Sequence, residues 1–129
     1  MIEDLALEPI GREFDLVAIR AYLESMTTVV PDPLDPSRYL MASDPRTRRD
    51  GLAQRLEHPA KIPYALTTIV PSPTCILIGM RSTDPAPVRA FVQWLRDHQD
   101  IRILDQEFND FTQEAKENLD FIFGPSENK

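Results

Sequence analysis

Two Asp-Pro pairs constrain the fold of this chain more than any other feature. Asp44-Pro45 follows the strand-like run 39–42, and Asp84-Pro85 follows the strand-like run 74–81. Aspartate is a favoured N-cap and proline a favoured first helical residue, so each pair predicts the start of a helix. Another strand-like segment follows each of these helices. The sequence therefore predicts two strand–helix–strand units in one chain.

The other elements follow from hydrophobic periodicity and from turn residues. We expect helices over residues 15–27, 45–57, 85–98 and 109–123, and strands over residues 38–43, 63–70, 74–81 and 101–104. Residues 1–13 are expected to form an irregular lead-in, because Pro9 and Gly11 interrupt any pattern there. The proline-rich segment 31–36 predicts a stiff loop.

The order β-α-β-β-α-β is that of the ferredoxin-like, two-layer α+β sandwich, with two helices on one face of a four-stranded antiparallel sheet. We expect an additional N-terminal helix, 15–27, and an additional C-terminal helix, 109–123. The alternative is another two-layer α+β sandwich in which 45–57 is irregular, because Gly51 lies inside that segment. Residues 1–125 are expected to form one domain, and residues 126–129 a loose tail.

Composition narrows the class of protein. Fourteen basic and twenty-one acidic residues give a net charge of −7, which disfavours a nucleic-acid partner and favours a basic one. The single cysteine, Cys75, lies in an apolar run and is expected to be a buried small hydrophobe. Neither a signal segment nor an apolar run of membrane-spanning length is evident, so we expect a cytoplasmic protein that does not bind a membrane.

Chemistry-bearing motifs are scarce. Asp44 and Asp84 are better explained as helix caps than as an acid–base pair, and His58 and His98 lack a third metal ligand nearby in the sequence. No catalytic residue, metal or cofactor is therefore predicted. A basic group beside the helix after Asp44 is interpreted as a solvated face rather than an anion site; it comprises Arg46, Arg48, Arg49 and Arg55.

The last predicted helix carries the most suggestive pattern. Glu107, Asp110, Glu114 and Glu117 recur at spacings of three, four and three, which places them along one side of a helix. Phe121 falls within the same acidic sector at 100° per residue. An aromatic beside carboxylates is typical of a contact surface for a basic protein. The alternative is an ordinary amphipathic helix whose polar side faces water.

These features favour a non-enzymatic, acidic protein-binding domain. An immunity protein, which neutralises a toxin by covering its active site, fits this size, charge and lack of catalytic residues. One alternative is a small-molecule-binding or regulatory domain with an apolar pocket near Arg38, Tyr39 and Tyr64. Another is an enzyme whose site is assembled from scattered residues. The sequence does not specify an oligomeric state.

Overall fold

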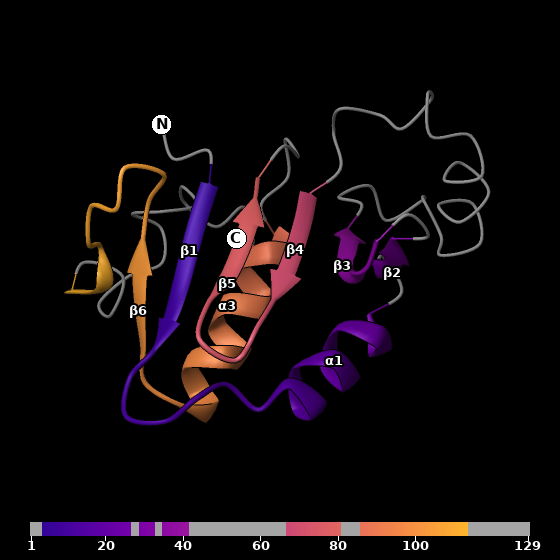
Figure 1. The fold of residues 1–129 in the computed structure, drawn as a ribbon, viewed down its shortest axis with the longest axis horizontal. Coiled ribbons are helices and arrows are strands. Elements are labelled where there is room, and N and C mark those ends of the chain that lie inside the picture. The colour runs from indigo at the N-terminus through magenta and orange to yellow at the C-terminus, as the bar shows by residue number, and fades with distance from the viewer. Residues whose placement is uncertain (1–3, 27–28, 33–34, 42–66, 81–85, 114–129) are drawn as a thin grey trace, which may run out of the picture.

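The computed structural model describes residues 4–26, 29–32, 35–41, 67–80 and 86–113 (Figure 1). Its elements are, in chain order, β1 (Asp4–Pro9), α1 (Leu16–Ser25), β2 (Val29–Asp32), β3 (Asp35–Met41), β4 (Thr67–Pro71), β5 (Ile76–Gly79), α3 (Ala86–His98) and β6 (Ile101–Leu104).

The six strands form one sheet in the order β2-β3-β4-β5-β1-β6, and each neighbouring pair is antiparallel (Figure 1). The prediction of a ferredoxin-like sheet of four strands is therefore wrong, although the protein does combine helices with an antiparallel sheet. The two strands that the prediction lacked are β1, which lies between β5 and β6, and β2, which forms one edge.

The expectation of an irregular N-terminal lead-in is wrong for β1. Leu5 and Leu7 alternate with Ala6 along this strand, and all three side chains are buried. Pro9, which has no backbone N–H to donate to a neighbouring strand, is the last residue of β1. The antiparallel ladder with β6 is extended by Ile10, whose N–H donates to the carbonyl of Asp100 at 3.0 Å.

The first predicted strand–helix–strand unit is also wrong in its pairing. Tyr39 of β3 lies opposite Ile69 of β4 in an antiparallel pair, whereas that unit requires parallel strands. The predicted helix 45–57 and its Asp44-Pro45 start lie outside the described residues.

The second unit is confirmed in its elements. Strand β5, helix α3 and strand β6 follow one another as predicted. Both strands run antiparallel to β1, so they are parallel to each other with β1 between them. The unit is therefore a split strand–helix–strand unit whose gap is filled by the N-terminal strand.

The proline-rich segment contributes strands as well as a turn, which corrects the expected loop over 31–36. Pro31 lies in β2 and Pro36 in β3. Among the described strands, β2 pairs with β3 alone, so it is an edge strand of this sheet. An edge strand tolerates Pro31, because no hydrogen bond of the sheet is lost when the missing N–H is on the unpaired side of the strand. The missing donor also discourages pairing with another chain.

The two described helices bear out the hydrophobic periodicity that predicted them. Asp15 caps α1 by accepting hydrogen bonds from the backbone of Val17 and Ala18 at 3.1 and 3.2 Å. Ile19 and Leu23 of α1 are buried. The apolar stripe of α3 is buried throughout and consists of Val88, Phe91, Val92 and Leu95.

Both helices pack on one face of the sheet and share a single core with it. The core side of the strands includes Leu7, Tyr39, Ile69, Ile78 and Ile103. Between the helices, the rings of Tyr22 and Trp94 stack with centroids 4.3 Å apart and planes at 17°.

The alternate residues of each strand point to the opposite face of the sheet. Val70 pairs with Leu77, and Leu77 pairs with Ala6, so these three form one row across β4, β5 and β1. This row forms the floor of a cavity that is described below.

Candidate functional site

The segment that follows β6 differs from the predicted helix 109–123. Glu107 lies in a turn, and Asp110 forms an isolated bridge with Leu104. The first helical residues after the bridge are Thr112 and Gln113. Glu107 and Asp110 therefore do not lie on one side of a common helix. The other three predicted partner-binding residues are outside the described residues, namely Glu114, Glu117 and Phe121.

A buried carboxylate holds this turn together. Asp105 Oδ1 accepts hydrogen bonds from the backbone N–H groups of Glu107 at 2.9 Å and Asn109 at 2.8 Å, and its Oδ2 accepts from Asn109 Nδ2 at 3.1 Å. The backbone of Asp105 also exchanges hydrogen bonds with Phe108 and Asn109, each at 3.0 Å. We name residues 105–110 the Asp105 turn. Because these hydrogen bonds tie Asp105 to three residues of the turn, the turn has a defined shape.

The Asp105 turn is also fastened to the edge of the sheet. Phe111 N–H donates to the carbonyl of Ile103 at 2.8 Å, and Ile103 N–H donates to Thr112 Oγ1 at 2.8 Å. These two bonds occupy polar groups of β6 that would otherwise be unpaired at an edge. They fix the position of the turn relative to β1 and β6.

Phe108 projects from the middle of this turn. Its side chain is 75% exposed, and its φ of 63° lies in the left-handed region. A bulky residue adopts that conformation at a cost of roughly 1–2 kcal/mol, and glycine would occupy it without strain. Phe108 therefore contributes little burial to the fold while imposing backbone strain on it.

The charges around Phe108 are mainly negative. Glu107 and Asp4 are exposed. Asp110 accepts a hydrogen bond from Thr112 N–H at 2.8 Å and lies 3.7 Å from Arg102, whose guanidinium is also 3.7 Å from Glu8. Asp110 thus has local partners of its own, and its role in binding another protein stays a prediction.

Among the described residues, three aspartates have a lowered pKa. In Asp35 the cause is hydrogen bonding from the side chain and backbone of Ser37, and in Asp110 it is hydrogen bonding from Thr112. Burial raises the pKa of Asp105, but the hydrogen bonds from Asn109 and Glu107 outweigh it, so the net shift is downward.

Acid is expected to destabilise the protein through these groups. A carboxyl whose pKa is lower in the folded chain stabilises it fully above the unfolded pKa, about 4, and loses that contribution as the pH falls through the folded value. Thermal melting between about pH 5 and pH 2 should show a falling Tm, with a smaller fall in Asp105→Asn.

The control for this prediction is Asp97→Asn, the same substitution on the exposed side of α3, where the carboxylate accepts from Gln93 Nε2 at 2.9 Å. It separates the loss of one charge from the loss of the turn's hydrogen bonds. Equal acid sensitivity in the parent and Asp105→Asn would show that the turn does not contribute.

A cavity of about 400 Å³ lies on the sheet face opposite α1 and α3. Its floor is the row of Val70, Leu77 and Ala6. The Asp105 turn, with Phe108, forms the wall at the β1 end, and Arg38 of β3 forms the wall at the other. Of the three residues near which a pocket was expected, Arg38 lines this cavity. Tyr39 lies in the core on the other face of the sheet. Tyr64 lies outside the described residues.

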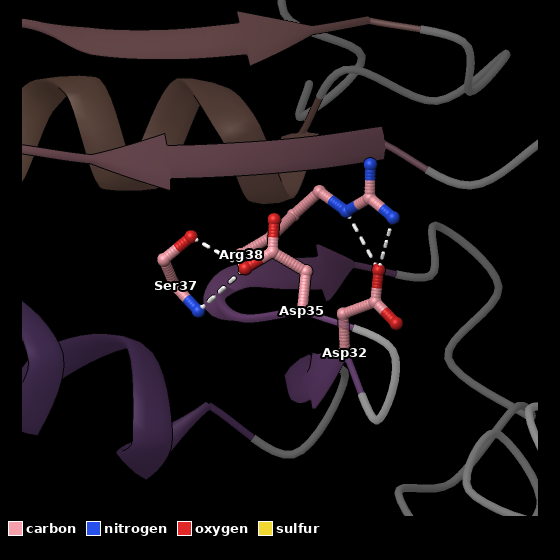
Figure 2. Close-up of polar contacts among 4 residues, drawn as sticks. All are labelled: Asp32, Asp35, Ser37 and Arg38. Carbon is pink, nitrogen blue, oxygen red and sulfur yellow. Dashed lines mark hydrogen bonds and ion pairs between the residues drawn. The ribbon is translucent and has the colours of Figure 1, made fainter.

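Arg38 is held in place by a buried carboxylate. Its Nε donates to Asp32 Oδ2 at 2.6 Å, and its Nη2 forms an ion pair with the same oxygen. The Asp32 side chain is 2% exposed and that of Arg38 is 38% exposed. Figure 2 shows the remaining guanidinium nitrogen directed away from Asp32. The neighbouring Asp35 and Ser37 form a separate hydrogen-bonded pair.

Other candidate groups have structural surroundings. Cys75 is half-buried, and its pKa is raised by burial and then by the charge of Glu8, which disfavours the nucleophilic thiolate. The ring of His98 packs on Trp94, with centroids 4.3 Å apart, and its Nδ1 lies 2.7 Å from the Trp94 carbonyl oxygen. His58 and the four arginines of the predicted solvated face lie outside the described residues.

Within the described ranges, no three His, Cys, Asp or Glu side chains cluster in a way that could hold a metal ion. In the same part of the chain, neither helix combines the length and apolarity needed to cross a lipid bilayer.

No family model matches the chain, and comparisons with curated proteins and with solved structures found no similar protein. The function is therefore argued from the Asp105 turn and the cavity alone.

The sequence interpretation missed Phe108 as a candidate, because a helix over 109–123 places it with Phe111 on the apolar side. The polar spacing of Asp105 and Asn109 was the available signal, since both residue types favour turns and tolerate hydrogen bonding to their own backbone.

Proposed function

We propose that this protein is a non-enzymatic protein-binding domain whose contact surface centres on Phe108. The observation that supports the proposal is the strained, exposed aromatic on a turn that is held by the hydrogen bonds of Asp105. A side chain that strains the backbone and buries little in the fold is better explained by contact with another molecule. Exposed aromatics on rigid supports are typical anchors of protein interfaces.

The charge of the surface indicates the partner. Glu107 precedes Phe108, Asp4 lines the same cavity as Phe108, and the whole chain carries a net charge of −7. A basic partner would be steered toward such a surface, and its association rate would fall with added salt. Within this class we propose an immunity protein, in which the domain covers the charged cleft of a toxin.

Phe108→Gly is expected to raise stability and to weaken binding at the same time. Glycine removes the strain of the left-handed conformation, so the free energy of unfolding should rise by about 1 kcal/mol. Loss of an aromatic anchor should weaken partner binding by at least 2 kcal/mol, about 30-fold. Denaturant titration measures the first effect, and titration calorimetry with a captured partner measures the second.

The partner is sought by affinity capture from the native host with three baits, which are the parent protein, Phe108→Gly and Val17→Ala. Val17 is exposed on α1, on the helix-bearing side of the sheet. A specific partner is retained by the parent and by Val17→Ala and lost with Phe108→Gly. If it is an enzyme, one equivalent of this protein should inhibit it. Identical recoveries with all three baits would contradict the proposal.

A further inference from the structure

We propose that the cavity on the sheet face opposite the helices binds a small amphiphilic carboxylate, a molecule with one carboxylate and an apolar chain. This site goes beyond the proposed protein-binding function, because it needs no partner protein. Its volume of about 400 Å³ is within the usual range of small-molecule pockets.

The floor of the cavity is apolar where β4, β5 and β1 lie side by side. The row of Val70, Leu77 and Ala6 crosses these three strands, and Leu77 is exposed there although it is a large hydrophobe. Gly79 lies in the next row. A Cβ at Gly79 would lie 2.8 Å from Thr68 Oγ1 and 3.5 Å from Asp4 Oδ1, so the polar ends of these two side chains lie over the glycine. The row with Leu77 thus offers apolar surface to an alkyl chain beside a polar row.

Polar donors lie at the β3–β4 end. Arg38 uses Nε and Nη2 for Asp32, and its Nη1 makes no such contact with another described residue. The Thr68 hydroxyl lines the same cavity and likewise forms no hydrogen bond within the described residues. A guanidinium fixed by a buried carboxylate is a preorganised donor. Since Asp32 balances its charge, the carboxylate would be held by hydrogen bonds rather than by a bare cation.

The β1 side of the cavity selects against a second negative charge. The exposed Asp4 begins β1, and its Oδ1 would lie 3.5 Å from a Cβ at Gly79, so this carboxylate reaches over β5. Phe108 lines the same cavity. Asp105 also lines this side, but its carboxylate oxygens already accept three hydrogen bonds from the turn. A ligand carboxylate is therefore favoured at Arg38 and disfavoured near Asp4, which leaves the apolar chain to run toward Phe108.

The length of the floor sets the size of the ligand. From Val70 on β4 to Ala6 on β1, the alkyl chain of a ligand would cross two strand spacings of about 4.8 Å, roughly 10 Å in all. Octanoate has a carboxylate and an apolar chain that fit this span, so it is the probe of choice. Octanol and octylamine have the same chain with a neutral or a positive head group.

The experiment measures binding of the three probes to the full chain by chemical-shift perturbation and titration calorimetry. Octanoate is expected to bind at least about tenfold more tightly than octanol, because only in the octanoate complex are both the donor, Arg38, and the acceptor charged. Octylamine is expected to bind more weakly than octanoate. Equal affinity for the three probes, or binding of none of them, would overturn the proposal.

A matched pair of variants locates the site. Leu77→Trp fills the cavity from its floor and should weaken octanoate binding at least about tenfold. Val17→Trp adds the same side chain at an exposed position on the helix-bearing side and should leave binding unchanged. Thr68→Val, which keeps the shape of the side chain and removes its hydroxyl, should weaken octanoate binding while leaving octanol binding unchanged. Octanoate binding that survives Leu77→Trp would overturn the site.

The outcome is independent of the protein partner. Phe108→Gly abolishes the proposed partner contact but leaves Arg38, Thr68 and the floor of the cavity in place. We expect it to retain octanoate binding within about threefold, since only one wall is shortened. If Phe108→Gly loses partner binding but retains octanoate binding, the two sites are separate. If octanoate binds only to the parent, then Phe108 rather than Arg38 determines the affinity, and the assignment of the carboxylate site to Arg38 is overturned.

Discussion

Phe91→Ala is expected to lower the free energy of unfolding by about 3–5 kcal/mol, which is a large share of the stability of a domain of this size. Phe91 is fully buried in the stripe of α3 and lies with its ring 6.0 Å from that of Tyr22 and 6.5 Å from that of Trp94. Removing it leaves a cavity at the point where α3, α1 and the sheet meet, and both neighbouring rings lose a contact.

Urea titration followed by circular dichroism measures the loss. The matched control is Phe108→Ala, the same substitution at the exposed turn, which should change stability by no more than about 0.5 kcal/mol. The difference between the two variants isolates burial from the chemistry of the substitution. Similar losses in both variants would contradict the placement of Phe91 in the core.

Arg38→Met is expected to cost about 2–3 kcal/mol, because it leaves the Asp32 carboxylate buried without its guanidinium. The cost stays below that of a wholly buried pair, since the Arg38 side chain is partly exposed and water can reach it. Methionine keeps much of the apolar stem, so the loss reports mainly on the missing hydrogen bonds.

Two further variants test the interpretation of this pair. Arg102→Met is the matched control, because Arg102 is exposed and lies 3.7 Å from each of its two carboxylates; it should cost at most about 0.5 kcal/mol. The double variant Asp32→Leu/Arg38→Met should be more stable than Arg38→Met alone, since it also removes the buried carboxylate that loses its guanidinium. A double variant that loses the sum of both single effects would show that Asp32 and Arg38 are not coupled.

The elements with strong local signals were predictable from the sequence. The Asp15 cap with its apolar face, the stripe of α3 and the alternation of β6 each involve residues close together in the chain. Their periodicity and caps are the local effects that determine helices and strands. The hairpin of β4 and β5 was likewise expected, because two β-rich runs flank a short proline-containing turn.

The order of the strands was not predictable in this way. Strand β1 ends in a proline and carries acidic residues, so its own sequence resembles a lead-in. Its strand conformation comes from pairing with β5 and β6 on both sides. The same dependence on distant partners hid the site. Arg38 and Phe108 reach one cavity only because β3 and β6 belong to the same sheet.

The interior position of β1 also bears on the kinetics of folding. Its residues are synthesised before those of the other strands, yet their partners in β6 are residues 101–104. During synthesis, β1 must therefore wait until these later residues emerge from the ribosome. Pairing between segments so distant in sequence is slow because a long loop must close first. Insertion of β1 is therefore expected to be a late step. Until β1 pairs, β5 would form an unpaired edge of a partly folded sheet.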